Sequence, residues 1–124
     1  DKFGVIDIEE VKSAINDSTV LICIMAANNE TGVLQPIHEI ATICQQKDIL
    51  FFCDTTQWIG KLPLDTQQIP IDVLCLSAHK IHGPKGIGAL YIRRNPPKYQ
   101  LLSLVEIRKL VLEEAHMQSI RLQD

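Results

Sequence analysis

One stretch organises the rest of the chain: residues 73–88 read VLCLSAHKIHGPKGIG. The apolar run Val73–Leu76 has the composition of a buried strand, and Lys80 follows it in a turn rich in glycine. Burial of an ammonium group is costly, so a lysine in such a place tends to lose its proton. A neutral lysine amine can attack a carbonyl group and bind it covalently. Considered alone, the stretch more often holds a surface lysine that opens a loop, and residues upstream decide between the two interpretations.

The composition is that of a small folded domain or part of one. The chain has 124 residues, 46% of them hydrophobic, and a formal net charge of −3. It has no basic arm with interleaved aromatic residues, so we expect no nucleic-acid partner. The longest apolar run, Val20–Ala27, is too short to span a bilayer, so we expect no membrane span. The first residues show neither an initiator methionine nor a signal-peptide pattern, so we expect the chain to be cut from a longer protein.

The four cysteines form no C-x-x-C pair. Metal ligation, a disulfide and a catalytic nucleophile are the functional alternatives, but we favour small buried hydrophobic residues and expect no metal site. Reduced, buried thiols suit a cytoplasmic protein, so we expect a cytoplasmic location. These residues are Cys23, Cys44, Cys53 and Cys75.

Helical patterns and apolar runs alternate along the chain. Helices are predicted to begin near Asp7 and at Pro36, the second with an inward face of Ile37, Ile40, Ala41 and Cys44. Four strands are predicted, at residues 19–27, 49–53, 71–76 and 87–92. The first is nearly all apolar and rich in β-branched residues, which predicts burial on both faces. This order predicts an α/β fold with a mostly parallel sheet and flanking helices.

Polar side chains follow three of the predicted strands. They are Asn28 and Asn29 after the first, Asp54 and Gln57 after the second, and Ser77, His79 and Lys80 after the third. Ligands of open α/β sheets bind beyond the carboxyl ends of the strands, so we expect these groups to share one rim. The residue types suit an aldehyde-bearing pyridine cofactor, which needs an amine, a carboxylate for its ring nitrogen, and donors for its phenolic oxygen and phosphate.

Three motifs resemble those of the pyridoxal-phosphate cysteine desulfurases of the NifS/IscS type, which belong with the class V aminotransferases. The motifs are ANNETG at 27–32, DTTQ at 54–57 with Gly60-Lys61, and SAHK at 77–80 with GPKG at 83–86. The resemblance covers residues 1–104 and implies part of the large, cofactor-binding domain of a type I pyridoxal-phosphate-dependent transferase. From Ser103 the chain has the pattern of an amphipathic C-terminal helix. Residues 105–124 depart from the family pattern, and we hypothesise that this helical tail results from a shifted reading frame.

The resemblance implies pyridoxal 5′-phosphate as cofactor and gives roles to three of the residues around its ring. Lys80 would hold the cofactor covalently and later move the α-proton of the substrate. Asp54 would pair with the pyridine nitrogen, and Gln57 would hydrogen-bond the phenolic oxygen.

The remaining site residues are placed by the same resemblance. Ser77 and His79 would bind the phosphate. Asn29 would lie beside the cofactor and contact the substrate carboxylate.

The implied reaction takes sulfur from L-cysteine, leaves L-alanine and forms a persulfide on an enzyme cysteine. Sulfur then passes to an acceptor such as an iron–sulfur scaffold or a thiolation protein, and the full-length form would be a homodimer. In this family the persulfide cysteine lies well beyond the lysine, where this chain has no cysteine, so we expect the chain to be inactive by itself. Two alternatives remain open: another class V enzyme, such as a selenocysteine lyase or an aminotransferase, and a non-catalytic fragment that keeps the fold core.

Overall fold

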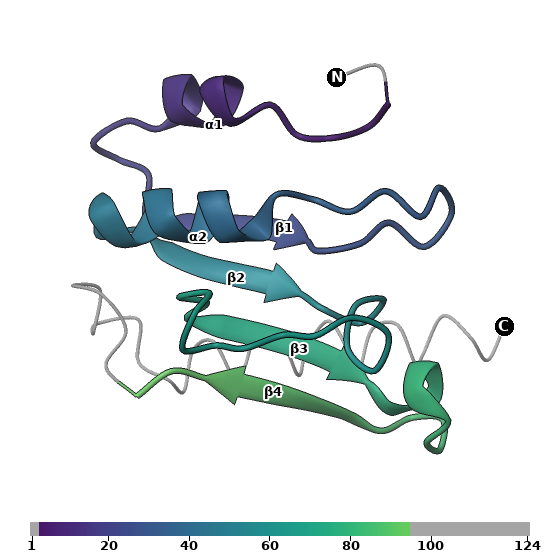
Figure 1. Cartoon of the computed structure of the whole chain (residues 1–124). Coiled ribbons are helices and arrows are strands. Elements are labelled where there is room, and N and C mark those ends of the chain that lie inside the picture. Colours follow the sequence, from purple (N-terminus) through teal and green to yellow (C-terminus); the bar gives the residue numbers. More distant parts are fainter. Residues whose placement is uncertain (1–2, 95–124) are drawn as a thin grey trace, which may run out of the picture.

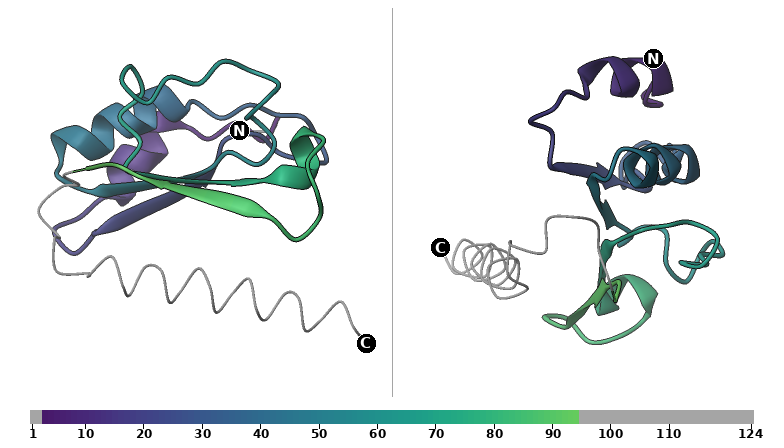
Figure 2. Two further views of the ribbon diagram at one scale, coloured as in Figure 1. Left: turned by 90° about the horizontal axis from the view of Figure 1, so that it is seen from below. Right: turned by 90° about the vertical axis from the view of Figure 1, so that its left-hand side faces the viewer.

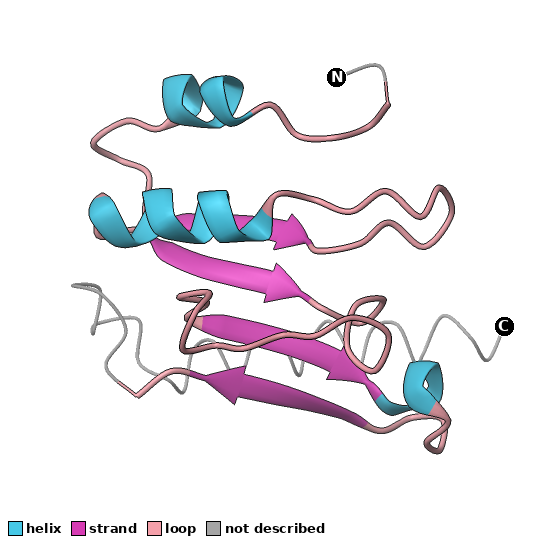
Figure 3. Cartoon of the chain, viewed as in Figure 1, coloured by secondary structure: helices cyan, strands magenta, loops and turns pink. Residues whose placement is uncertain are grey.

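The computed structural model describes residues 3–94 of the chain. They form a four-stranded sheet in the order β1-β2-β3-β4, with β1, β2 and β3 parallel and β4 antiparallel (Figures 1 and 3). The elements are α1 (Ile8–Ala14), β1 (Leu21–Met25), α2 (Ile37–Gln46), β2 (Leu50–Asp54), β3 (Val73–Ser77), the 3-10 turn η1 (Ala78–Ile81) and β4 (Gly88–Ile92). The predicted α/β fold with a mostly parallel sheet is confirmed. The predicted C-terminal helix and the tail at 105–124 lie outside the described residues.

Both helices begin where the sequence predicts. The Asp7 side chain accepts the N–H of Glu9 at 2.8 Å, which satisfies one of the free amides at the start of α1. Pro36 stands just before α2, where a missing N–H costs nothing. The predicted inward face of α2 is buried: Ile37, Ile40, Ala41 and Cys44.

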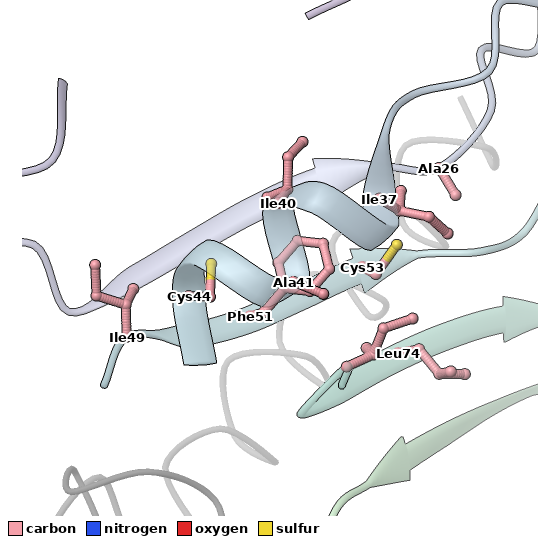
Figure 4. Close-up of a cluster of buried hydrophobic side chains, with 10 residues drawn as sticks. Ala26, Ile37, Ile40, Ala41, Cys44, Ile49, Phe51, Cys53 and Leu74 are labelled. Carbon is pink, nitrogen blue, oxygen red and sulfur yellow. The ribbon is translucent and has the colours of Figure 1, made fainter. Parts of the chain in front are cut away.

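The hydrophobic core lies between α2 and one face of the sheet. Phe51 of β2 is fully buried at its centre, and α2 lies over β2 with Ala41 and Cys44 near the ring (Figure 4). Ile22 and Ile24 of β1 pack against the same cluster. Burial of a large aromatic side chain stabilises a fold by several kcal/mol, so this contact holds the helix to the sheet.

The prediction that the first strand is buried on both faces is wrong. Leu21 is 46% exposed and Met25 43%, and Cys23 between them is also exposed. Among the described residues, α2 and the connection 55–72 lie on one face of the sheet, and β1 lies at its edge (Figure 2). Only the alternate residues of β1, which point at α2, are therefore covered.

The described residues include no membrane-crossing helix, since none of their helices is long and apolar enough. Within residues 3–94 there is also no group of three or more His, Cys, Asp or Glu side chains that could hold a metal ion.

Asp72, directly before β3, is a buried carboxylate that joins three strands. Its Oδ2 accepts the N–H of Phe51 at 2.9 Å, and its main-chain oxygen accepts the N–H of Arg93 at 2.7 Å. Its Oδ1 has no hydrogen-bond partner and lies 3.7 Å from the Arg93 guanidinium. Burial raises the pKa of Asp72, while the Phe51 N–H and the Arg93 charge oppose that rise.

The raised pKa makes the stability of the fold depend on pH. The contribution of Asp72 to the stability of the fold is fully present below its pKa in the unfolded chain, about 3.9. It is lost as the pH rises through the pKa of Asp72 in the folded chain. Arg93→Met removes the opposing charge, so we expect the free energy of unfolding to fall by about 1–3 kcal/mol at pH 7 and by less at pH 4. Urea unfolding at both pH values measures this. Arg94→Met, which changes an exposed neighbour, should have little effect, and equal losses for Arg93→Met at both pH values would contradict the interpretation.

Candidate functional site

Three connections meet at the carboxyl rim of the parallel strands. Figure 1 shows β1, β2 and β3 pointing the same way, with the loop 26–36, the segment 55–62 and η1 following them at one end. In the sheet register Met25 pairs with Asp54, and Asp54 pairs with Cys75. The structure therefore brings the segments that carry the predicted site residues to a shared edge.

Asp54 is the last residue of β2 and is held firmly by its neighbours. Its Oδ1 accepts the N–H of Thr56 at 2.9 Å, and its main-chain oxygen accepts the N–H of Ala26 at 2.8 Å. The half-buried carboxylate thus stands at the centre of the rim, between the ends of β1 and β3.

Thr55 locks the ends of β2 and β3 together, a role that was not evident from the sequence. The side chain is fully buried, and its Oγ1 donates to the Cys75 carbonyl at 2.8 Å. The N–H of Thr55 donates to the same oxygen at 3.0 Å. A polar residue that directly follows an apolar strand is the only sequence signal for such a lock.

Gln57 lies in the tightly wound segment 55–62, which is closed by main-chain hydrogen bonds such as Leu62 N–H to the Trp58 oxygen at 3.0 Å. Its side chain is half-buried, and its Oε1 accepts a hydrogen bond from Lys61 Nζ at 2.7 Å. The side-chain amide is therefore already oriented by a neighbour.

Ser77 and His79 are brought into direct contact. Ser77 Oγ lies 2.7 Å from His79 Nδ1, with Ser77 half-buried at the end of β3 and His79 exposed in η1. When the Nδ1–H of His79 donates to Ser77 Oγ, the Ser77 hydroxyl keeps its hydrogen and can donate it to an anionic oxygen, as a phosphate requires.

Lys80 is exposed, so the sequence-based expectation that this lysine is buried is wrong. The strand ends at Ser77, and the 3-10 turn η1 carries Lys80 away from the buried part of the sheet. Gly83 closes this turn: its N–H donates to the Ala78 oxygen at 2.8 Å, and a Cβ there would lie 2.8 Å from the Ala78 Cβ. The amine is therefore accessible on a defined turn.

Asn28 and Asn29 have different roles. The Oδ1 of Asn28 accepts the N–H groups of Glu30 at 2.8 Å and Thr31 at 3.0 Å, so this side chain shapes the loop. Asn29 is exposed next to it, in the loop that the Ala27–Leu34 bridge closes. Of the two, Asn29 is the more exposed.

Gly60 joins the segment that carries Gln57 to the turn that carries Lys80. Its φ is +79°, and a Cβ at this position would lie 2.7 Å from Ile81 Cγ2 in η1. Two conditions, a left-handed backbone and a close approach, therefore require glycine here.

We expect Gly60→Ala to lower the free energy of unfolding by about 2–4 kcal/mol, because strain at positive φ adds to the clash with Ile81. Gly86→Ala is the matched control: its φ is +78°, but nothing lies within 4 Å of the added Cβ, so only the backbone part of the loss remains. Chemical denaturation measures both. Ile81→Ala should lower the free energy of unfolding less in the Gly60→Ala background than in the wild type. Equal losses for Gly60→Ala and Gly86→Ala would show that the contact with Ile81 is unimportant.

Comparison with known proteins identifies the family. The family model described as Aminotransferase class-V matches residues 1–117. The chain belongs to this family. A mitosomal cysteine desulfurase from Trachipleistophora hominis is 55% identical over 95 residues, which are 77% of this chain and 22% of that protein. The cysteine desulfurase IscS of Histophilus somni (strain 2336) is 54% identical over 93 residues, 75% of this chain and 23% of that protein.

The solved structures that resemble this chain include a NifS-like protein, with a TM-score of 0.72 at 41% identity, over 77% of this chain and 27% of that one. The structure of SspA in complex with cysteine superposes with a TM-score of 0.72 at 46% identity, over 73% of this chain and 26% of that one. The expected resemblance of this class V chain to NifS/IscS-type cysteine desulfurases is thus confirmed. The chain spans about a quarter of the length of these relatives.

Three of the four cysteines of this class V chain lie in surroundings that raise the pKa of their thiols. Burial, with smaller effects of Asp72 and Asp54, raises the pKa of Cys44 and Cys53 to about 12. Burial, followed by the Asp54 charge, raises the pKa of Cys75 to about 11. Because the thiolate is the nucleophilic form, the raised pKa lowers the reactivity of these thiols at neutral pH. The prediction of buried cysteines is correct for Cys44 and Cys53, and wrong for the exposed Cys23.

These environments predict an order of alkylation. At pH 8 in the native protein, iodoacetamide should modify Cys23 first, while Cys44 and Cys53 should react only after unfolding in urea, since they are buried and keep their protons. Peptide mass spectrometry measures each site. Labelling of Cys53 at the rate of Cys23 would show that the core is open.

Proposed function

We propose that this chain carries the cofactor platform of a pyridoxal-phosphate-dependent cysteine desulfurase. The observation that carries the proposal is the meeting of three strand ends at one rim. Asp54 and Ser77 end neighbouring parallel strands, and the turn η1 that follows carries His79, which contacts Ser77, and Lys80. The identity of 54–55% to cysteine desulfurases supports the same activity.

The donor set at the rim fits the cofactor. The exposed amine of Lys80 can bind an aldehyde, and the carboxylate of Asp54 can pair with a protonated ring nitrogen. The Ser77–His79 pair can hold the phosphate, and the Gln57 amide can donate to the phenolic oxygen. Once bound, pyridoxal phosphate supplies an electron sink that makes the α-proton of an amino acid acidic.

The chain's own residues then hold charge and move protons. Asp54, fixed by the Thr56 N–H, would pair with the ring nitrogen and hold the proton there. Lys80 would be the base that takes the α-proton of the substrate. Asn29 orients the substrate by contacting the carboxylate of the substrate.

Sulfur transfer requires a reactive thiolate. The bond between sulfur and Cβ of L-cysteine breaks, a sulfur–sulfur bond forms on an enzyme cysteine, and protonation of the remaining carbon skeleton yields L-alanine. The raised pKa values of Cys44, Cys53 and Cys75 favour a nucleophile other than these three. The 124-residue chain is therefore proposed to bind the cofactor without completing the reaction by itself.

We further propose that the whole protein is a homodimer that hands sulfur to an acceptor such as an iron–sulfur scaffold or a thiolation protein. None of the cysteines in the described part of the chain forms a disulfide, which suits the reducing cytoplasm. One relative is a mitosomal enzyme, and cell fractionation distinguishes the two locations.

Covalent cofactor binding tests the central proposal. Mixing the purified protein with pyridoxal phosphate should produce the visible absorption band of a lysine-bound cofactor, and borohydride should fix the cofactor on the peptide that contains Lys80. Lys80→Ala should abolish the band. Lys85→Ala, which removes another exposed lysine of the same turn, should leave it unchanged. A band that survives Lys80→Ala refutes the assignment.

A further inference from the structure

We infer that Lys61 is a positioning residue that decides which end of the Gln57 amide faces the cofactor; this rests on the proposed function. Lys61 Nζ lies 2.7 Å from Gln57 Oε1. An ammonium group can only donate hydrogen bonds, so this contact selects the carbonyl oxygen of the amide. The NH2 group of Gln57 is then the end that is left for another partner, and it can only donate.

The direction of this amide matters for the proposed ligand. The phenolic oxygen of pyridoxal phosphate is an anionic acceptor, and a donor stabilises its charge. A glutamine amide without a fixed neighbour can present either its NH2 group or its oxygen, and the oxygen would repel the phenolic oxygen. Lys61 removes the unfavourable choice.

The local fold places the pair at the rim. Gln57 is half-buried and Lys61 is exposed. The N–H of Lys61 donates to the Trp58 oxygen at 3.1 Å. This hydrogen bond winds the chain into a turn, which brings the Lys61 side chain close to that of Gln57. Gly60, between them, packs against Ile81 in the turn that carries Lys80. The segment that carries the Gln57 amide therefore lies against the turn that carries Lys80.

The experiment follows the pH titration of the visible band of the lysine-bound cofactor, which reports on the charge of the phenolic oxygen rather than on turnover. Lys61→Met should raise the pKa of this titration by about 1, because donation to the phenolic oxygen is weakened. Lys61→Arg keeps a donor and should restore the wild-type titration. Gln57→Ala should also raise the pKa, and Lys61→Met should then add nothing further.

Two controls separate the inference from simpler effects. Lys85→Met removes an exposed cation from the Lys80 turn and should not move the titration if amide direction, rather than overall charge, is decisive. Urea unfolding should show that Lys61→Met leaves stability unchanged. An unshifted titration in Lys61→Met, or a shift that persists in the Gln57→Ala background, overturns the inference alone. Absence of the band in the wild type overturns the proposed function and the inference together.

Discussion

The parallel pairing of β2 with both of its neighbours is the constraint on which the site depends. At the end of β2 the Asp54 oxygen accepts the N–H of Ala26, and Thr55 donates both its N–H and its hydroxyl to the Cys75 oxygen. These hydrogen bonds align the three strand ends. Because parallel strands place their carboxyl ends at one edge, every polar residue just beyond them is delivered to the same rim.

The core and the candidate site use different parts of the same strands. Phe51 and Cys53 point at α2 and are buried, whereas Asp54 follows them at the rim. The burial of apolar area depends on the volume and polarity of the core side chains. The alignment of the rim residues depends instead on the register of the strands. The packing of the sheet can therefore hold the rim in place without restricting which chemistry the rim residues perform.

The rim is also organised by contacts between its connections. Gly60 allows the segment 55–62 to approach Ile81, and Gly83 closes η1 against Ala78. Through these contacts the segment that carries Gln57 packs against the turn that carries Lys80, although Gln57 and Lys80 lie far apart in the sequence. Side-chain hydrogen bonds, from Lys61 to Gln57 and between Ser77 and His79, then orient the functional groups.

Most of the fold could be predicted from the sequence, because apolar runs, a cap at Asp7 and a proline before α2 are local signals. The motifs likewise identified the family, since the order of residues along the chain is all that a motif requires. The exposure of β1 and of Lys80 could not be predicted: an apolar run shows that a strand can be buried, but only the arrangement of neighbouring elements determines which face is covered. The role of Thr55, the Ser77–His79 contact and the direction of the Gln57 amide were decided by tertiary structure for the same reason. Hydrogen bonds depend on distances across strands and turns, and the sequence contains no such distances.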